Sequence, residues 1–481
     1  MYDVLIIGCG ITGAAMAYEL SKYRLSVAVL EAENDVATGA TKANSAILHA
    51  GYDPIPGTLM AKLNVRGVQL AKELCAALDV PYSQTGSLVV GFSGADEATL
   101  SGLYRRGKEN GVEGLDLLSG DEARTIEPFL SQEVTCALHA PTAAVCSPWE
   151  YCLALAETAV RNGVEIRLSS PVTAIQKNPT GGWWVTTPDS VYEARFVVNA
   201  AGVFADKVHD LAASHAFSIY PSRGQYYLLD KGEHIRSSRV IFQCPNESGK
   251  GVLVAPTVHG NLIVGPNAEA VVGEDTATTL DGLSYVRQTA AKSIPTVNFR
   301  ESIRNFAGVR AHADGGDFII NQAMDAPGFF DLAGICSPGL SAAPAIAEYA
   351  AGLMEQSGLV LTPREDFICT RTRTRFKELS PAEKAALVER EPAYGRVICR
   401  CETVTEGEIL EALQSPIPPC SVDAVKRRVN AGMGRCQGGF CAPRVVEILC
   451  RELGLSPDEI MQDRAGTQML YEETKGGASH V

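Results

Sequence analysis

Four cysteines near the C-terminus stand at spacings that suit a metal centre. They form one CxC pair and one CxxxxC pair, with the residues Cys399, Cys401, Cys436 and Cys441. Four thiolates suffice for a [2Fe–2S] cluster or for an all-cysteine zinc site. Structural zinc usually has CxxC knuckles, so these spacings favour iron–sulfur. We therefore predict a one-electron centre in this part of the chain, with structural zinc as the alternative.

A glycine-rich turn near the N-terminus has the residues that a dinucleotide needs. Gly8, Gly10 and Gly13 follow an apolar stretch and open a helical one, and Glu31 stands 23 residues after Gly8. The glycines permit a tight turn, close approach of the pyrophosphate and close helix packing, while the helix N-terminus faces the phosphates. The carboxylate suits a ribose hydroxyl. A plain glycine turn is the alternative, but the full context predicts a flavin or nicotinamide site.

His49 ends a small, polar loop over 41–51. A hydroxyl substrate that loses hydride needs a base for its O–H proton, and neutral histidine suits that role near pH 7. A histidine that only packs or caps this loop is the alternative.

Three further features could serve a substrate or the flavin. A helix follows the stretch Ser337-Pro-Gly-Leu-Ser341, and its N-terminal N–H groups could face the N1/C2 carbonyl edge of a flavin. The alternative is an ordinary helix capped by a serine. Lys250 and Arg310 could each bind an anionic group, although most such cations are solvated surface residues.

The elements that must position these residues read as a divided α/β fold. We expect a strand at 2–7, a helix at 11–23, a strand at 25–30, a second helix and strand at 150–168, and an apolar strand ending at Gly202. A strand at 329–332 precedes a helix starting near Ser341. Segments such as 87–92, 224–229 and 251–254 are typical of antiparallel strands. The prediction is a discontinuous Rossmann-like domain, an antiparallel-sheet substrate domain and a small helical C-terminal domain.

The expected boundaries follow from these patterns. The oxidoreductase part covers 1–365, with nucleotide-binding parts at about 1–80, 145–210 and 320–365 and substrate parts at about 81–144 and 211–319. A linker follows at 366–394, the cysteine module at 395–455 and a polar tail at 456–481.

Composition limits the partners. A net charge of −14 argues against nucleic acid and acidic membranes, so an anionic substrate needs a local cationic pocket. The chain opens directly on a strand, without a secretion signal, and six of its 14 cysteines fall between Cys399 and Cys450. We expect metal binding in a reducing cytoplasm, with at most peripheral association at the inner face of the cell membrane through partners.

Several stretches resemble one group of flavoenzymes. They are ANSAILHAGYDP at 43–54, RGQY at 223–226, GKGVLVAP at 249–256, VGP at 264–266, FAGVR at 306–310, DFII at 317–320 and SPGL at 337–340. Residues 1 to about 350 are similar to the D-amino-acid-oxidase superfamily, specifically to FAD-dependent glycerol-3-phosphate oxidases and dehydrogenases.

The resemblance implies roles for individual residues. His49 matches the active-site histidine, and Lys250 and Arg310 match ligands of the substrate phosphate. Ser337 and Leu340 fall on the loop beside the flavin, where we predict that Ser337 binds substrate. We further predict that FAD is contacted by Gly8, Gly10, Gly13, Glu31, Thr41, Asn44, Ser45, Gly202, Gly339, Leu340 and Ser341. Ala46 departs from the family, which usually has glycine after Asn-Ser, and this loosens the substrate assignment.

The C-terminal module resembles the bacterioferritin-associated-ferredoxin-like [2Fe–2S] domain. Such a domain also ends the catalytic subunit of anaerobic glycerol-3-phosphate dehydrogenases, which work with partner subunits. The CxxxxC pair departs from that ferredoxin's CxxC and matches the versions fused to flavoenzymes. The resemblance implies an electron-accepting flavoprotein or iron–sulfur subunit as partner.

The expected activity is oxidation of sn-glycerol 3-phosphate by FAD, with electrons leaving through the cluster to a partner protein or quinone. L-2-hydroxyglutarate dehydrogenases share a similar loop, so a 2-hydroxy acid is the alternative substrate. An oxygen-using oxidase with a structural cysteine module and a non-catalytic flavoprotein scaffold are the other readings.

Overall fold

The protein divides into two compact units in the computed structural model, which describes residues 1–232, 237–245 and 251–472. The first unit contains Met1–Leu30 and Ala37–Arg371, and the second contains Glu31–Val36 and Thr372–Val481. Mixed α/β architecture confirms the expected fold class. The finer boundaries between nucleotide-binding and substrate parts stay predictions.

The first sheet carries the N-terminal glycine turn. In the described part of the chain it has eight strands, ordered β10-β11-β12-β1-β2-β9, with β20 joining β12 and β19 joining β20. The strands β1, β2, β9, β12 and β20 run parallel where they pair. Their bounds are β1 Tyr2–Ile7, β2 Val27–Leu30, β9 Glu165–Arg167, β10 Ala174–Lys177, β11 Trp183–Thr186, β12 Val191–Asn199, β19 Ile319–Gln322 and β20 Phe329–Ala333.

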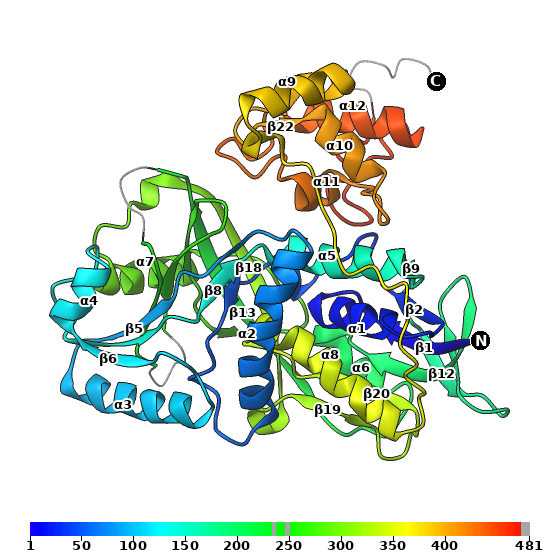
Figure 1. Cartoon of the computed structure of the whole chain (residues 1–481), viewed down its shortest axis with the longest axis horizontal. Coiled ribbons are helices and arrows are strands. Elements are labelled where there is room, and N and C mark those ends of the chain that lie inside the picture. The colour runs from blue at the N-terminus through cyan, green and yellow to red at the C-terminus, as the bar shows by residue number, and fades with distance from the viewer. Residues whose placement is uncertain (233–236, 246–250, 473–481) are drawn as a thin grey trace, which may run out of the picture. The chain divides into compact units, whose positions relative to one another are not determined.

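Three helices pack together beside this sheet: α1 (Ile11–Ser21) contacts both α5 (Pro148–Arg161) and α8 (Gly339–Gln356), and Figure 1 shows α1 between the other two. Every residue of α1 is buried: most of its side chains are apolar, and the carboxylate of Glu19 is paired with Lys22. Alternating strands and helices along the chain thus produce the predicted Rossmann-like layer, in which parallel strands end at one edge.

The second sheet is built mostly from antiparallel strands. Its described strands follow the order β17-β13-β16-β15-β14-β5-β7-β6, with β18 paired along β13. One pair, β14 with β5, is parallel, which the sequence reading did not foresee. The bounds are β5 Ser87–Gly91, β6 Asp116–Ser119, β7 Cys136–Ala140, β13 Ile219–Leu229, β14 Val240–Gln243, β15 Leu253–Pro256, β16 Leu262–Gly265, β17 Glu269–Ala270 and β18 Ser302–Ala313.

Each face of this second sheet carries a hydrophobic cluster. Along β5, Val89 packs into one hydrophobic cluster, whereas Leu88 and Val90 pack into another. This alternation follows from the two-residue period of a strand. The covering helices α3 (Gly94–Glu109), α4 (Gly120–Ile126) and α7 (Leu280–Ser293) contact its strands, as Figure 1 shows.

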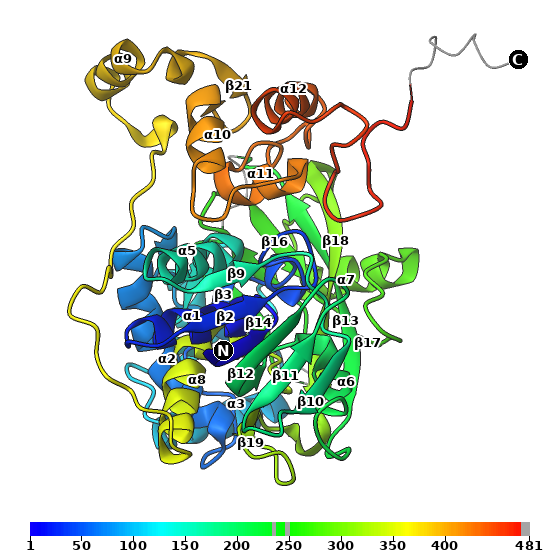
Figure 2. The same cartoon turned by 90° about the vertical axis from the view of Figure 1, so that its right-hand side faces the viewer.

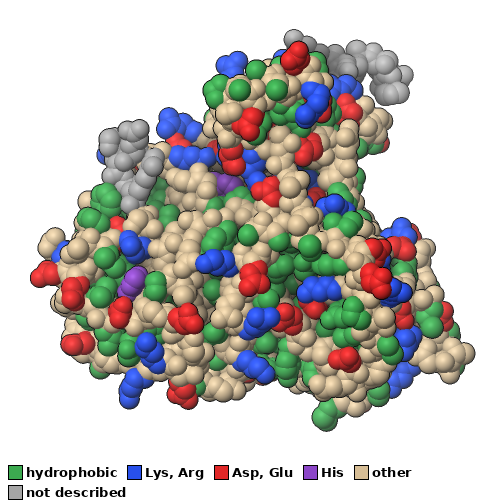
Figure 3. All heavy atoms as spheres, viewed as in Figure 1, with side chains coloured by type: hydrophobic (Ala, Val, Ile, Leu, Met, Phe, Trp, Pro, Cys, Tyr) green, Lys and Arg blue, Asp and Glu red, His purple; other side chains and the backbone are tan. Residues whose placement is uncertain are grey.

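Short elements complete the first unit. A three-stranded sheet joins β3 (Ile47–Leu48) and β4 (Tyr82–Ser83) to β8 (Ala144–Cys146). The long helix α2 (Leu59–Ala77) packs on α8, and α6 (Ala205–His209) follows β12. On the face shown in Figure 3, acidic and basic side chains are intermixed rather than gathered by sign.

The second unit holds the cysteine module. Its helices α10 (Glu406–Leu413), α11 (Val422–Val429) and α12 (Ala442–Leu453) group together in Figure 2 and share one core with the short strands. These strands are β21 Val397–Cys399 and β22 Val404–Thr405, and α9 spans Pro381–Arg390.

A buried carboxylate anchors the segment Glu31–Val36 within this second unit. Asp35 accepts hydrogen bonds from Arg427 at 2.8 Å and from Arg428 at 2.8 Å, and all three side chains are at most 3% exposed. Burial alone would raise the pKa of Asp35, but the guanidinium of Arg428, and then that of Arg427, lowers it below its ordinary value. The second unit is therefore completed by six residues from the N-terminal part of the chain.

No helix among the described residues is long and apolar enough to cross a membrane.

Candidate functional site

The glycine turn has the geometry that a dinucleotide requires. Gly8 has φ +96°, and a Cβ atom there would lie 2.6 Å from the carbonyl oxygen of Ala200. A Cβ atom on Gly13 would lie 2.0 Å from the oxygen of Gly8, so only glycine lets α1 pack this closely on β1. The first turn of α1 has no acidic side chain that would repel a pyrophosphate. The residues present fit FAD.

Two further residues predicted to contact FAD are Glu31, which follows β2 and belongs to the second unit, and Gly202, which follows β12. Ile7 lies beside Leu30 in the sheet, so Glu31 is the first residue beyond the strand end. Its carboxylate is 7% exposed and accepts a hydrogen bond from the backbone of Glu33 at 2.9 Å. Gly202, with φ +58°, opens a short 3-10 turn after the neighbouring strand β12. Their contacts with FAD stay predictions.

The loop over 41–46 is fixed by its own polar side chains. The buried Thr41 hydroxyl accepts a hydrogen bond from the N–H of Ile11 at 2.9 Å, which ties the loop to the start of α1. Asn44 donates to the carbonyl of Thr41 at 2.8 Å and accepts from the N–H of Ala46 at 2.7 Å. Ser45 lies 3.2 Å from the hydroxyl of Tyr226 on β13.

Two close approaches explain the small residues around this loop. Ala46 has φ +60°, a conformation that costs a residue with a Cβ atom about 1–2 kcal/mol, so the glycine usual here in the family has a steric reason. A Cβ atom on Gly308 of β18 would lie 1.8 Å from the oxygen of Ala43. The glycine of the FAGVR stretch therefore lets the loop pass over β18.

His49 is held by groups from three distant segments. Its N–H donates to the Ser341 hydroxyl at 2.7 Å, and its carbonyl accepts from Asn64 at 2.7 Å. The Nε2 atom lies 3.3 Å from the Ser337 hydroxyl, and the ring stacks on Phe242 with centroids 5.6 Å apart. A histidine with an anchored backbone and a half-buried ring can hold or release a proton at a fixed position.

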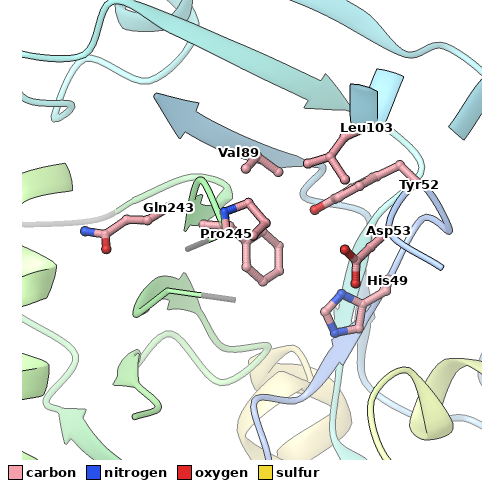
Figure 4. A pocket seen from close by; sticks show the side chains of 8 residues that line it. His49, Tyr52, Asp53, Val89, Leu103, Gln243 and Pro245 are labelled. Carbon is pink, nitrogen blue, oxygen red and sulfur yellow. The ribbon is translucent and has the colours of Figure 1, made fainter. Parts of the chain in front are cut away.

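This histidine faces a pocket in the first unit with about 310 Å³ of empty volume, part of it open to solvent. Figure 4 shows the pocket from close by. Its walls come from the loop after β3, from β5, from α3 and from β14, and the described residues lining it are His49, Tyr52, Asp53, Val89, Leu103, Phe242, Gln243 and Pro245. The imidazole of His49 therefore lines a hollow that is partly open to solvent.

The helix after Ser337 begins two residues earlier than expected. The sequence placed its start near Ser341, but α8 starts at Gly339, directly after Pro338. Gly339, Leu340 and Ser341 therefore form its first turn, where backbone N–H groups have no partner within the helix. Close packing is possible here because a Cβ atom on Gly67 would lie 2.2 Å from the oxygen of Ser341.

The two predicted cationic residues are placed differently. Arg310 lies on β18 opposite Ser222, over Gly224, and its guanidinium donates to the carbonyl of Asn267 at 3.3 Å. It is not among the described residues that line the pocket at His49. Lys250 lies outside the described residues.

Sequence reasoning missed several groups that build the site. Phe242 supports the ring of His49, Asn64 holds its carbonyl, and Asp53 lines its pocket. For Asn64 a signal existed, because an asparagine stands among the buried residues of α2 and is itself fully buried. Phe242 carried no signal, since an apolar residue in a strand reads as core.

The four cysteines lie together as two pairs in the second unit. Cys401 and Cys436 have their sulfur atoms 3.7 Å apart on the outside, while Cys399 and Cys441 are 1% and 2% exposed. A hydrogen bond from Cys441 lowers the pKa of the Cys399 thiol to about 6, although burial opposes this. The same hydrogen bond, and next burial, raises the pKa of the Cys441 thiol, so the proton of this pair stays on Cys441.

The outer pair has a spacing that suits a shared metal. A tetrahedral metal with metal–sulfur bonds of about 2.3 Å holds two thiolates about 3.8 Å apart, close to the 3.7 Å between the sulfur atoms of Cys401 and Cys436. The four thiols could hold a [2Fe–2S] cluster, which would supply one-electron transfer. A Cβ atom on Gly434 would lie 2.3 Å from that of Cys401, so the loop leaves no spare room.

A Rossmann-like unit with a glycine turn, together with a four-thiolate module, defines a redox flavoprotein with an iron–sulfur centre. Residues 3–353 match the family model of FAD dependent oxidoreductases, and residues 397–451 match the BFD-like [2Fe-2S] binding domain. The chain belongs to the FAD dependent oxidoreductase family, and its cofactors are FAD and a [2Fe–2S] cluster.

Individual relatives agree with this assignment. The chain is 48% identical over 477 residues to a glycerol 3-phosphate dehydrogenase of Caloramator mitchellensis, with 99% of both chains covered. The structure of dithionite-reduced L-alpha-glycerophosphate oxidase from Mycoplasma pneumoniae, with FAD bound, is similar at 32% identity and a TM-score of 0.73, covering 78% of this chain and 99% of that chain. L-2-hydroxyglutarate dehydrogenase of Arabidopsis thaliana is 27% identical over 402 residues, 73% of this chain and 82% of the relative.

Proposed function

We propose that this enzyme oxidises sn-glycerol 3-phosphate to dihydroxyacetone phosphate. The observation that carries the proposal is the anchored His49, whose Nε2 atom faces a serine hydroxyl in a solvent-connected pocket of an FAD-dependent oxidoreductase. The 48% identity over the full length to a glycerol 3-phosphate dehydrogenase supports the choice of substrate.

The chain's own residues supply binding and proton transfer. The substrate's C–OH group loses a proton to Nε2 of His49 and a hydride from carbon, so the alcohol becomes a ketone. Arg310, and Lys250 with it, bind the phosphate and place the carbon for reaction, a positioning role that supplies several kcal/mol. Ser337 contacts the reacting hydroxyl beside His49. When bound, FAD accepts the hydride, and the [2Fe–2S] cluster carries electrons singly onward.

Electrons leave, in this proposal, to a partner protein or quinone rather than to oxygen. The match to the oxidase from Mycoplasma pneumoniae covers 99% of the oxidase but only 78% of this chain. The match to the dehydrogenase relative covers 99% of this chain. A match over 99% of the chain includes the cysteine module, so the dehydrogenase relative extends through this region. We propose Cys399, Cys401, Cys436 and Cys441 as the cluster ligands.

An anaerobic titration tests the substrate. Glycerol 3-phosphate is expected to bleach the flavin absorbance and then to produce the EPR signal of a reduced cluster. L-2-hydroxyglutarate is the comparison, because similarity to its dehydrogenase makes it the second candidate. Bleaching by 2-hydroxyglutarate alone would reject the proposed substrate, and rapid peroxide formation in air would reject the proposed acceptor.

A further inference from the structure

The ring of His49 presents its two nitrogen atoms to different surroundings. Nε2 lies 3.3 Å from the Ser337 hydroxyl, and the backbone on both sides of the ring is held by Ser341 and Asn64. The ring also stacks on Phe242. Because the imidazole cannot turn freely, whichever group faces Nδ1 decides which nitrogen carries the proton in the neutral form.

Asp53 is placed to be that group. It lines the same pocket as His49, and in Figure 4 its carboxylate points toward the imidazole. The intervening chain turns back at Gly51, which has φ +112°. This turn returns Asp53 to the histidine four positions before it, which a straight strand could not do.

The backbone of this turn is clamped by α3. Arg106 donates to the carbonyl of Asp53 at 2.5 Å, and Asn110 donates to the carbonyls of Gly51 at 3.0 Å and Pro54 at 2.8 Å. These three bonds fix the position from which the carboxylate reaches into the pocket. A carboxylate on a clamped turn loses little freedom when it binds a neighbour.

The surroundings strengthen any interaction of this carboxylate. The pocket walls otherwise consist largely of Val89, Leu103, Phe242 and Pro245, and among its described lining residues Tyr52 and Asp53 are the titratable ones besides His49. Burial, and next the charge of Asp53, raises the pKa of the Tyr52 phenol far above its ordinary value. An acidic group in such apolar surroundings acts strongly on a nearby imidazole.

We propose that Asp53 is the positioning residue of His49. Its carboxylate accepts the Nδ1 proton, keeps Nε2 unprotonated toward the substrate hydroxyl, and stabilises the imidazolium that forms when Nε2 takes the proton. The inference rests on the proposed role of His49 as base and assigns Asp53 no contact with substrate.

The first test compares flavin reduction in the holoenzyme variants Asp53→Asn, Asp53→Glu and His49→Gln. Anaerobic stopped-flow mixing with glycerol 3-phosphate gives the limiting rate and the substrate Kd. Asp53→Asn is expected to lower the limiting rate about 10²–10³-fold with little change in Kd. The apparent pKa of the rate should fall by about one unit or more, because the lost negative charge had favoured imidazolium. Asp53→Glu should keep most of the rate and the higher pKa.

The second test observes the tautomer directly. ¹⁵N-histidine labelling of the oxidised holoenzyme gives signals from the chain's eight histidines, and His49→Gln identifies the one of interest. We expect a protonated Nδ1 atom in the wild type and in Asp53→Glu, and a protonated Nε2 atom in Asp53→Asn, where the amide donates to Nδ1. Glu109→Gln, which removes an exposed carboxylate from α3, should leave rate, pH profile and tautomer unchanged.

The outcomes separate the two proposals. If glycerol 3-phosphate does not reduce the wild-type flavin, the proposed function fails. If it does, but His49→Gln reduces its flavin at the wild-type rate, the role of His49 as base is wrong, and that of Asp53 with it. If His49→Gln is impaired while Asp53→Asn keeps the wild-type rate, pH profile and tautomer, only the role of Asp53 is wrong. The role of Asp53 would also be overturned if Asp53→Glu and Asp53→Asn slowed the rate equally and both moved the proton to Nε2. The negative charge that glutamate retains would then have no effect on His49.

Discussion

The Ser337 hydroxyl lies 3.3 Å from Nε2 of His49, although 288 residues separate the two in the chain. The serine precedes α8, whose Ser341 also holds the backbone of His49. Residues at the start of one helix thus contact both the ring and the backbone of the proposed base. We therefore expect substitution of Ser337 to affect the reaction.

Ser337→Ala should slow flavin reduction by glycerol 3-phosphate about fivefold. The variant loses one polar contact at Nε2, and such a contact contributes about 1 kcal/mol. Anaerobic stopped-flow absorbance measures the rate, and Ser357→Ala, at the exposed C-terminal end of the same helix, is the control. A Ser337→Ala enzyme with unchanged rate and Kd would show that the serine takes no part.

Arg310→Gln should weaken binding of glycerol 3-phosphate by about 10–100-fold while leaving the limiting reduction rate closer to wild type. Hydrogen bonds to a charged group contribute about 1.5–3 kcal/mol, and the guanidinium is the cation proposed for the phosphate. The Kd comes from the substrate dependence of flavin bleaching. Arg304→Gln, exposed on the same strand, should bind normally, and equal effects in both variants would contradict a specific role for Arg310.

Cys401→Ser should remove or strongly alter the visible absorbance and EPR signal of the cluster while the flavin remains bound. A serine oxygen is a poorer ligand for iron than a thiolate, and Cys401 belongs to the outer sulfur pair. Cys450→Ser, on α12 in the same unit, should keep two irons per chain. Zinc without iron in the wild type, prepared anaerobically, would instead support a structural metal site.

Asp35→Asn should destabilise the second unit by about 3–5 kcal/mol, because two buried guanidinium groups lose their shared carboxylate. Urea unfolding of the holoenzyme, followed by visible circular dichroism of the cluster, measures this change. Asp458→Asn, exposed in the same unit, is the control. An unchanged midpoint in Asp35→Asn would mean that the Arg427 and Arg428 charges are satisfied by other groups.

The same carboxylate predicts an acid sensitivity. The pKa of Asp35 is lower in the folded protein than its ordinary value near 3.8. Its stabilising effect is therefore complete above that ordinary value and is lost as the pH falls through the folded pKa. Below about pH 4, the free energy of unfolding of the second unit should fall more steeply in the wild type than in Asp35→Asn, whose side chain does not titrate.

The sequence was informative wherever a residue type has one dominant use. The turn of Gly8, Gly10 and Gly13 could be placed between strand and helix, because only glycine tolerates its φ angle and its close contacts. The four cysteines could be grouped for a similar reason, since thiols at such spacings serve metals. The predicted start of α8 was two residues too late. Ser341 resembles a helix-capping serine in the sequence, but in the structure its hydroxyl accepts a hydrogen bond from the backbone of His49.

Other parts of the site carried a weak signal or none. Phe242 reads as an ordinary core residue, Asn64 is a polar residue on the buried face of a helix, and Asp53 falls within the ANSAILHAGYDP stretch, which gives it no role of its own. The predicted helix at 11–23 also ended two residues early, at Ser21, since helix ends depend on tertiary neighbours.

The sequence by itself determined that this chain has a dinucleotide turn and a four-thiol module, because glycine turns and paired thiols carry their chemistry in local spacing. Its resemblance to known flavoenzymes then favoured FAD and a [2Fe–2S] cluster over nicotinamide and zinc. Only the tertiary structure decided which groups hold His49, that the cysteines stand as an inner and an outer pair, and that Asp35 belongs to the second unit. The physical reason is distance along the chain: hydrogen bonds and ion pairs between residues hundreds of positions apart depend on how the sheets and helices pack, which no local pattern encodes.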